Sequence, residues 1–141
     1  MSTDPDVNDW KKLGQTDNAD FYEVEDGIIG IVPFRDAIDT EATAKASVDF
    51  QHRHWTERNR RGGAVIFMDR LRDSKAEARQ VYTTMPDATL ISGFALVGGT
   101  VFGRAVASVF LGLNKPSAPT RMFGTEEDAL AWLRRQNGGG D

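Results

Sequence analysis

The chain has 141 residues, of which 40% are hydrophobic and 27% charged, and its formal net charge is -4 at pH 7. These values are ordinary for one globular domain that folds on its own apolar core. The absence of cysteine excludes disulfides, thiol nucleophiles and thiolate metal sites. Two histidines leave little for a metal centre, and the acidic balance argues against a nucleic-acid partner. We expect no metal and no cofactor.

Both ends of the chain are predicted to be flexible around a domain at residues 21–136. Residues 1–20 are polar and acidic, and residues 137–141 are rich in glycine, so neither end has enough apolar surface to bury. The first 20 residues lack the apolar core of a signal peptide, and the apolar stretch 101–113 is too short to span a bilayer. We therefore expect a cytoplasmic protein without stable membrane insertion.

The domain begins with a predicted β-hairpin and a long helix. Residues 21–24 and 28–32 are two short runs with strand composition, and Asp26-Gly27 between them favours a tight turn. A helix is predicted over residues 40–61, with Asp39 or Thr40 as its N-cap. One face of this helix is predicted to be buried, and it carries Ala44, Val48, Gln51 and Trp55.

Strands and helices then alternate to the end of the domain. The pattern predicts strands at 64–68, 89–97 and 120–123, and helices at 74–85, at 101–113 with Thr100 as N-cap, and from Thr125 onward. Strands that alternate with helices form mainly parallel sheets. The predicted fold is therefore α/β, with a largely parallel sheet of about five strands and about four helices.

Four segments resemble the STAS domains, and more closely the small bacterial SpoIIAA-like proteins. They are the runs ALVGGT at 95–100, FLGLNKP at 110–116, TRMF at 120–123 and EEDALAWL at 126–133. The similarity covers residues 21–135. It implies an α/β fold first, and then a regulatory domain that binds a protein partner, because some STAS domains are anti-sigma-factor antagonists. Other members bind nucleotides or lipid-like ligands.

The resemblance also implies a candidate switch at Asp73 and Ser74. The antagonists are phosphorylated on a serine at the start of a helix, and Ser74 lies at the equivalent position. Small residues follow that serine in the antagonists, whereas Lys75 and Ala76 follow it here. A structural interpretation competes with the switch, because Ser74 and Glu77 have the spacing of a capping box, and this interpretation is favoured.

Two further segments are candidates for ligand binding. A predicted helix opens with Gly98, Gly99 and Thr100, and free backbone N–H groups at a helix start bind anions. Arg104 would add a positive charge to this candidate anion site. A structural turn between strand and helix is the simpler interpretation. The predicted helix 101–113 has more apolar surface than one core-facing stripe needs. The surplus apolar residues are Phe102, Val106, Phe110 and Leu111. They either pack in the core, line a ligand pocket, or form an interface with a partner or with a second copy of the chain.

The remaining titratable residues support no catalytic site. His52 and His54 point in different directions on a helix, so they do not share a metal ion. Asp69 and Asp73 follow a buried strand, where α/β enzymes place their sites, but no nucleophile–base pair joins them. We therefore expect a regulatory or protein-interaction module without catalytic residues. The alternative is a domain that binds a small apolar molecule or a lipid.

Overall fold

The computed structural model describes residues 4–100 and 117–138. Its strands are β1 (Lys11–Gln15), β2 (Ala19–Glu25), β3 (Ile28–Pro33), β4 (Ala37–Asp39), β5 (Gly62–Phe67), β6 (Leu71–Ser74), β7 (Ile91–Val97) and β8 (Thr120–Phe123). Its α-helices, within the described ranges, are α1 (Glu41–Glu57), α2 (Ala76–Thr84) and α4 (Glu126–Gln136). A single 3-10 turn over Met68–Arg70 joins β5 to β6.

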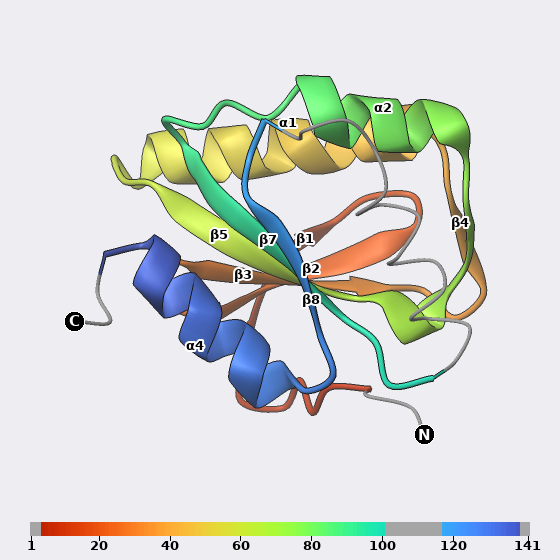
Figure 1. Ribbon diagram of the computed structural model, residues 1–141, viewed down its shortest axis with the longest axis horizontal. Coiled ribbons are helices and arrows are strands. Elements are labelled where there is room, and N and C mark those ends of the chain that lie inside the picture. Colours follow the sequence, from red (N-terminus) through yellow and green to blue (C-terminus); the bar gives the residue numbers. More distant parts are fainter. Residues whose placement is uncertain (1–3, 101–116, 139–141) are drawn as a thin grey trace.

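The main sheet is mixed, with the strand order β1-β2-β3-β5-β7-β8. The pairs β1–β2 and β2–β3 are antiparallel, whereas β3–β5, β5–β7 and β7–β8 are parallel. Helices α1 and α2 cover one face of this sheet and α4 covers the other (Figure 1). The predicted α/β class is confirmed, and the sheet has six strands where the sequence predicted about five.

Strand β1 corrects the prediction that residues 1–20 are wholly flexible. Lys11 and Lys12 pair with Glu23 and Tyr22, so this polar run adds a strand to the edge of the hairpin. Trp10, directly before β1, packs its ring against Tyr22 and Phe67, with centroids 5.9 and 6.0 Å apart. A polar segment gains order here because the neighbouring strand supplies backbone partners and one tryptophan reaches the core.

The sheet separates two hydrophobic cores. The core under α1 and α2 includes Phe21, Ile29, Trp55 and Met68, and the core under α4 includes Ile28, Phe67, Trp132 and Leu133. The central strands β3, β5 and β7 contribute side chains to both cores, which explains their nearly continuous apolar sequences. The two cores account for most of the large apolar side chains in the described ranges.

The first helix forms largely as its sequence predicts. Thr40 is the N-cap, and it makes a reciprocal capping box with Thr43. The predicted inner face is confirmed, since Ala44, Val48, Gln51 and Trp55 are all buried. The helix ends at Glu57, four residues before the predicted end, because Asn59 adopts a left-handed conformation with φ 53°.

Strand β6 corrects the prediction of a helix from residue 74. Residues 71–74 pair in parallel with β4, and Asp39 lies opposite Ser74 in this small second sheet. Helix α2 therefore begins at Ala76 with Lys75 as its N-cap, and no side chain caps it. The predicted capping box of Ser74 and Glu77 is wrong, because strand pairing places Ser74 before the helix.

The last helix also begins where its sequence predicts. Thr125 caps α4 by accepting a hydrogen bond from the backbone N–H of Asp128, as predicted.

No helix of the described residues is long and apolar enough to cross a membrane. The predicted helix 101–113 lies outside the described residues.

Candidate functional site

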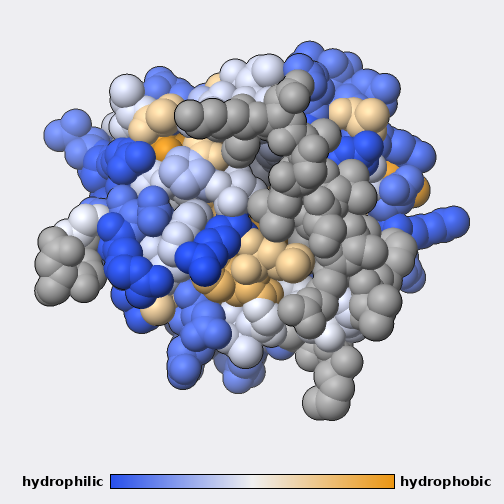
Figure 2. All heavy atoms as spheres, in the orientation of Figure 1, coloured by the Kyte–Doolittle hydropathy of each residue, from blue (hydrophilic) through white to orange (hydrophobic). Residues whose placement is uncertain are grey.

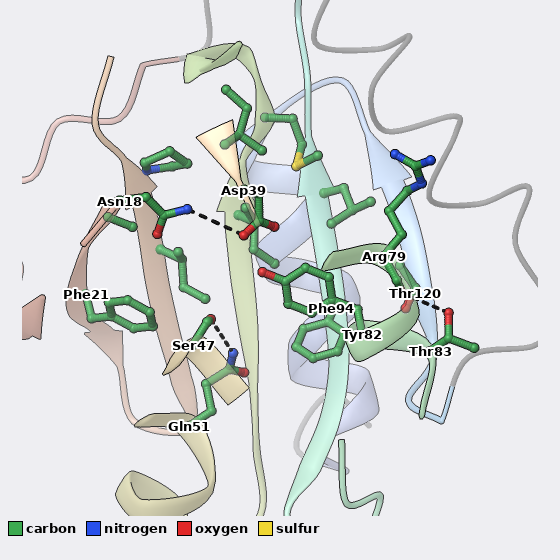
Figure 3. Close-up of a pocket in the computed structure, with 17 residues that line it drawn as sticks. Asn18, Phe21, Asp39, Ser47, Gln51, Arg79, Tyr82, Thr83, Phe94 and Thr120 are labelled. Carbon is green, nitrogen blue, oxygen red and sulfur yellow. Dashed lines mark hydrogen bonds between the residues drawn. The ribbon is translucent and has the colours of Figure 1, made fainter. Parts of the chain in front are cut away.

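A cavity of about 60 Å³ lies between the main sheet and helices α1 and α2 (Figure 3). By the measure in which one water needs about 10–15 Å³, it holds about four to six waters. Most of its wall is apolar, from strands β2, β3, β5, β6 and β7 and the turn after β5. These apolar side chains are Ala19, Phe21, Ile31, Pro33, Ile66, Met68, Leu71, Phe94 and Leu96.

A polar stripe on α1 forms one side of this cavity. Thr43, Ser47 and Gln51 follow one another at intervals of four residues on α1, which places them one above the other along the helix, and Asp39 ends β4 just before the helix begins. Asp39, Ser47 and Gln51 line the cavity and are 4%, 6% and 0% exposed. Polar side chains are rarely so deeply buried unless other groups satisfy them.

Hydrogen bonds connect this stripe to Tyr82 of α2. Gln51 Nε2 donates to Ser47 Oγ across 3.2 Å. The Tyr82 hydroxyl is hydrogen-bonded both to Ser47 and to Asp39. A phenol has one proton and a carboxylate can only accept, so Tyr82 donates to Asp39 and its oxygen accepts from the Ser47 hydroxyl.

The hydrogen bonds therefore run in one direction, from Gln51 through Ser47 and Tyr82 to Asp39. A carboxylate is only an acceptor, so it sets the direction of every bond before it. Asp39 Oδ1 also accepts from the Thr43 hydroxyl at 2.6 Å and from Asn18 Nδ2 at 3.4 Å. These donors partly compensate the burial of the Asp39 charge.

Burial nevertheless dominates the protonation of Asp39. Desolvation raises the pKa of this carboxyl above its ordinary value of 3.8, against the opposing effects of the hydrogen bonds from Thr43, Tyr82 and Asn18. Burial, followed by the charge of Asp39, also raises the pKa of Tyr82 well above 10.0. A buried carboxyl with a raised pKa in a cavity is a feature typical of functional sites.

Gln51 leaves one polar atom of the cavity unsatisfied. Its Oε1 atom is buried, and no hydrogen-bond donor in the described part of the chain reaches it. Figure 3 shows the amide nitrogen turned toward Ser47, with the oxygen on the other side. A buried acceptor without a protein partner is costly unless water or a bound molecule donates to it.

Arg79, Thr83 and Thr120 form the polar part of the opposite wall. Arg79 Nη1 donates to the backbone carbonyl of Ser74, and Thr83 Oγ1 donates to the carbonyl of Arg79 across 3.0 Å. Arg79 Nε is buried without an acceptor among the described residues. The cavity thus has an acidic, acceptor-rich side at α1 and a cationic side at α2 (Figure 3).

The candidate switch residues lie next to the cavity but do not line it. Ser74 is 5% exposed, and its buried hydroxyl has no partner in the described ranges. Asp73 is exposed and forms an ion pair with Lys75 at 3.2 Å. Hydrogen bonds from Lys75 and from the backbone of Ser74 lower the pKa of Asp73, which is opposite to the raised pKa that an acid catalyst would need.

The candidate anion site is occupied by a carboxylate of the protein itself. Asp69 accepts hydrogen bonds from the backbone N–H of Gly99 at 2.9 Å and of Thr100 at 3.0 Å, and from the Thr100 hydroxyl at 2.7 Å. Gly98 instead donates its N–H to the carbonyl of Phe123. Arg104 lies outside the described residues.

The other predicted candidates are dispersed or lie outside the described residues. Phe102, Val106, Phe110 and Leu111 belong to the second group. His52 Nε2 accepts the N–H of Asp87 at 3.0 Å, and no group of three metal-ligating side chains occurs in the described ranges. The arginines that end α1 contact acidic or carbonyl groups, in the pairs Arg58–Glu23, Arg60–Asp26 and Arg61–Ala88.

Comparison with known proteins identifies one family. Residues 22–137 match the model of a domain of unknown function, DUF7793. The chain belongs to the DUF7793 family. No curated protein and no solved structure matches it significantly. The predicted STAS assignment is therefore not supported by the family match, which gives only DUF7793, whereas the predicted domain boundaries of 21–136 nearly coincide with the matched residues.

Sequence reasoning missed the cavity because it considered the helices one at a time. Asp39 was considered only as a helix cap, and Tyr82 was not considered as a site residue. The available signal was the repeat of polar residues at 39, 43, 47 and 51 beside the buried positions Ala44 and Val48. Four polar residues in register with a core face are unusual for a helix that only packs on a sheet.

Proposed function

We propose that this domain is a non-catalytic binding module that takes up a small, largely apolar molecule between the sheet and helices α1 and α2. The observation that carries the proposal is the buried Oε1 atom of Gln51, a cavity-lining residue, which no donor among the described residues reaches. Natural ligand sites combine an apolar wall with a few convergent polar groups, and this cavity has both. The proposed site differs from the predicted one beneath residues 101–113, which lie outside the described residues.

The acidic side of the cavity supports binding over a purely structural role. Asp39 is buried at a cost that its hydrogen bonds do not fully offset, as the direction of its pKa shows. An apolar side chain of similar size would avoid this cost. Residues that lower stability in this way are typical of sites that serve function.

A catalytic role has less support in the described residues. Asp69 accepts hydrogen bonds from Gly99 and Thr100, and Asp73 is exposed beside Lys75. The two carboxylates that sequence reasoning considered for hydrolysis therefore have structural partners. The side-chain partners of Asp39 in the described part of the chain are Thr43, Tyr82 and Asn18, which do not form the nucleophile–base pair that covalent catalysis needs.

A regulatory protein-interaction module is the second candidate function. The order of a β-hairpin followed by alternating helices and strands supports the proposed kinship with STAS domains. The described surface supports a protein partner less, because Ile38, 38% exposed, is the exposed large hydrophobic residue among the described ones. Figure 2 shows a face that is mainly hydrophilic outside the grey residues, with small apolar patches. Phosphorylation of Ser74 would require local opening, since that side chain is 5% exposed.

Amide-resolved NMR with a panel of small alcohols, amines and ketones tests the proposed binding. We expect shifts at the cavity-lining residues, and loss of those shifts in Ala19→Leu, which fills the cavity from β2. Gly124→Ala is the control, because a Cβ at position 124 has no neighbour within 4 Å. A panel that shifts no cavity residue, or shifts that persist in Ala19→Leu, would refute the proposed function.

A further inference from the structure

The direction of the hydrogen bonds in the cavity specifies which chemical group the ligand must present. This inference rests on the proposed binding function. The single phenol proton of Tyr82 goes to the Asp39 carboxylate, so the phenol oxygen can only accept the one hydroxyl proton of Ser47. Ser47 Oγ therefore accepts from Gln51, which fixes the amide nitrogen toward Ser47 and leaves Oε1 as an acceptor facing the cavity.

The side of the cavity formed by α1 and β4 thus offers acceptors to a ligand. Asp39 accepts hydrogen bonds from Thr43, Asn18 and Tyr82, which leaves part of the acceptor capacity of a carboxylate unused. Gln51 Oε1 has all of its capacity unused within the described ranges. On this side, an incoming carbonyl or carboxylate would meet acceptors, whereas an incoming O–H or N–H group would meet partners.

We infer that the ligand is a small aliphatic molecule with a hydrogen-bond donor, a hydroxyl or a protonated amine, that donates to Gln51 Oε1. Its aliphatic part packs on the apolar wall formed by Phe21, Ile31, Phe94 and their neighbours. The cavity volume of about 60 Å³ suits a ligand of about five non-hydrogen atoms. The two donor chemistries are distinguished by Asp39, whose carboxylate favours a cation over a neutral hydroxyl.

The experiment compares three probes of equal size, isobutanol, isobutylamine and butanone, titrated into the full-length protein and followed by NMR. Butanone is the control because it has only an acceptor. We expect the Gln51 side-chain amide to shift with isobutanol or isobutylamine, and at least one of them to bind about tenfold more tightly than butanone. Asp39→Asn should weaken isobutylamine binding and leave isobutanol binding unchanged if the amine is the preferred donor.

Two variants test whether Gln51 is the partner. Gln51→Met keeps the shape and removes the acceptor, so the preference over butanone should disappear while cavity binding persists. Ser47→Ala frees the Gln51 amide to rotate, so butanone should gain affinity relative to isobutanol; this variant serves if Gln51→Met does not fold. Butanone binding as tightly as both donors, or an unchanged preference in these variants, would overturn the inference and leave the binding function standing. Failure of all three probes to shift any cavity residue would instead count against the binding function itself.

Discussion

The hydroxyl of Thr43 donates a 2.6 Å hydrogen bond to Asp39 Oδ1, across the first turn of α1. Thr43 also completes the capping box with Thr40, so one side chain serves both the helix start and the buried carboxylate. The start of α1 is thereby coupled to the cavity. This coupling makes the charge of Asp39 measurable through the stability of the whole domain.

Asp39→Asn removes a buried charge that lowers stability. It should therefore stabilise the protein at neutral pH by about 0.5–2 kcal/mol, the usual gain from one stabilising substitution. Because the folded-state pKa of Asp39 is raised, the folded protein binds its proton more tightly than the unfolded chain. In the wild type, the tighter proton binding by Asp39 stabilises the folded protein fully below about pH 3.8. This stabilisation is lost as pH rises through the folded-state pKa of Asp39. Urea unfolding from pH 4 to 8 should show the advantage of Asp39→Asn growing with pH. An advantage that is constant or shrinks with pH would contradict this prediction.

The coupling between Ser47 and Gln51 is testable by a double-mutant cycle. Ser47→Ala leaves the buried amide of Gln51 without its acceptor and should cost about 1–3 kcal/mol. Gln51→Met removes a buried polar group and should cost less than Ser47→Ala. In the double variant the two effects should differ from additivity by about 1 kcal/mol, whereas additivity within about 0.5 kcal/mol would show that the pair is independent. Denaturant unfolding measures all four free energies.

Asp69 should be required to satisfy the backbone at the end of β7. Asp69→Ala removes the acceptor of the N–H groups of Gly99 and Thr100, and should cost about 2 kcal/mol. Sulfate should then raise the unfolding temperature of Asp69→Ala more than that of the wild type, because the freed N–H groups favour an anion. Equal sulfate effects on both proteins would contradict this interpretation of the turn. The Asp73→Ala variant is the control, since Asp73 is exposed.

His54 should make the stability depend on pH near neutrality. Desolvation, followed by the positive charge of Arg58, lowers the folded-state pKa of His54 below 6.5, so the unfolded chain binds the proton more readily. The stability that comes from holding His54 neutral is therefore fully present above about pH 6.5. It falls as pH decreases toward the folded-state pKa of His54. His54→Gln should flatten this decrease in urea unfolding between pH 7.5 and 5.5. The decrease would be unchanged in His54→Gln if another group were responsible.

The contact between Gly62 and Trp55 should not tolerate a side chain. A Cβ at position 62 would lie 2.4 Å from the Trp55 ring, which is buried and cannot move aside easily. Gly62→Ala should therefore destabilise the protein by about 1–3 kcal/mol, the usual cost of overpacking. Gly124→Ala, where the added Cβ has no neighbour within 4 Å, should change the unfolding temperature little. Similar unfolding temperatures for the two variants would contradict this reading of the packing.

The predictable parts of the fold depend on local sequence patterns. The hairpin around Gly27, the Thr40 cap and the inner face of α1 follow from turn chemistry and helical periodicity, which act within a few residues of one another. The β1 strand was not predictable in this way, because its order comes from pairing with β2.

The sequence by itself determined the α/β class, the helix faces and the positions of most central strands, because each depends on periodicity within one segment. Only the tertiary structure decided that Asp39 pairs with Ser74 in a second sheet and that Tyr82 reaches Asp39 from helix α2. Those contacts join residues far apart in the chain, so no local pattern encodes them. The candidate site is therefore a product of packing, and the repeat of polar residues from Asp39 to Gln51 is its sole trace in the sequence.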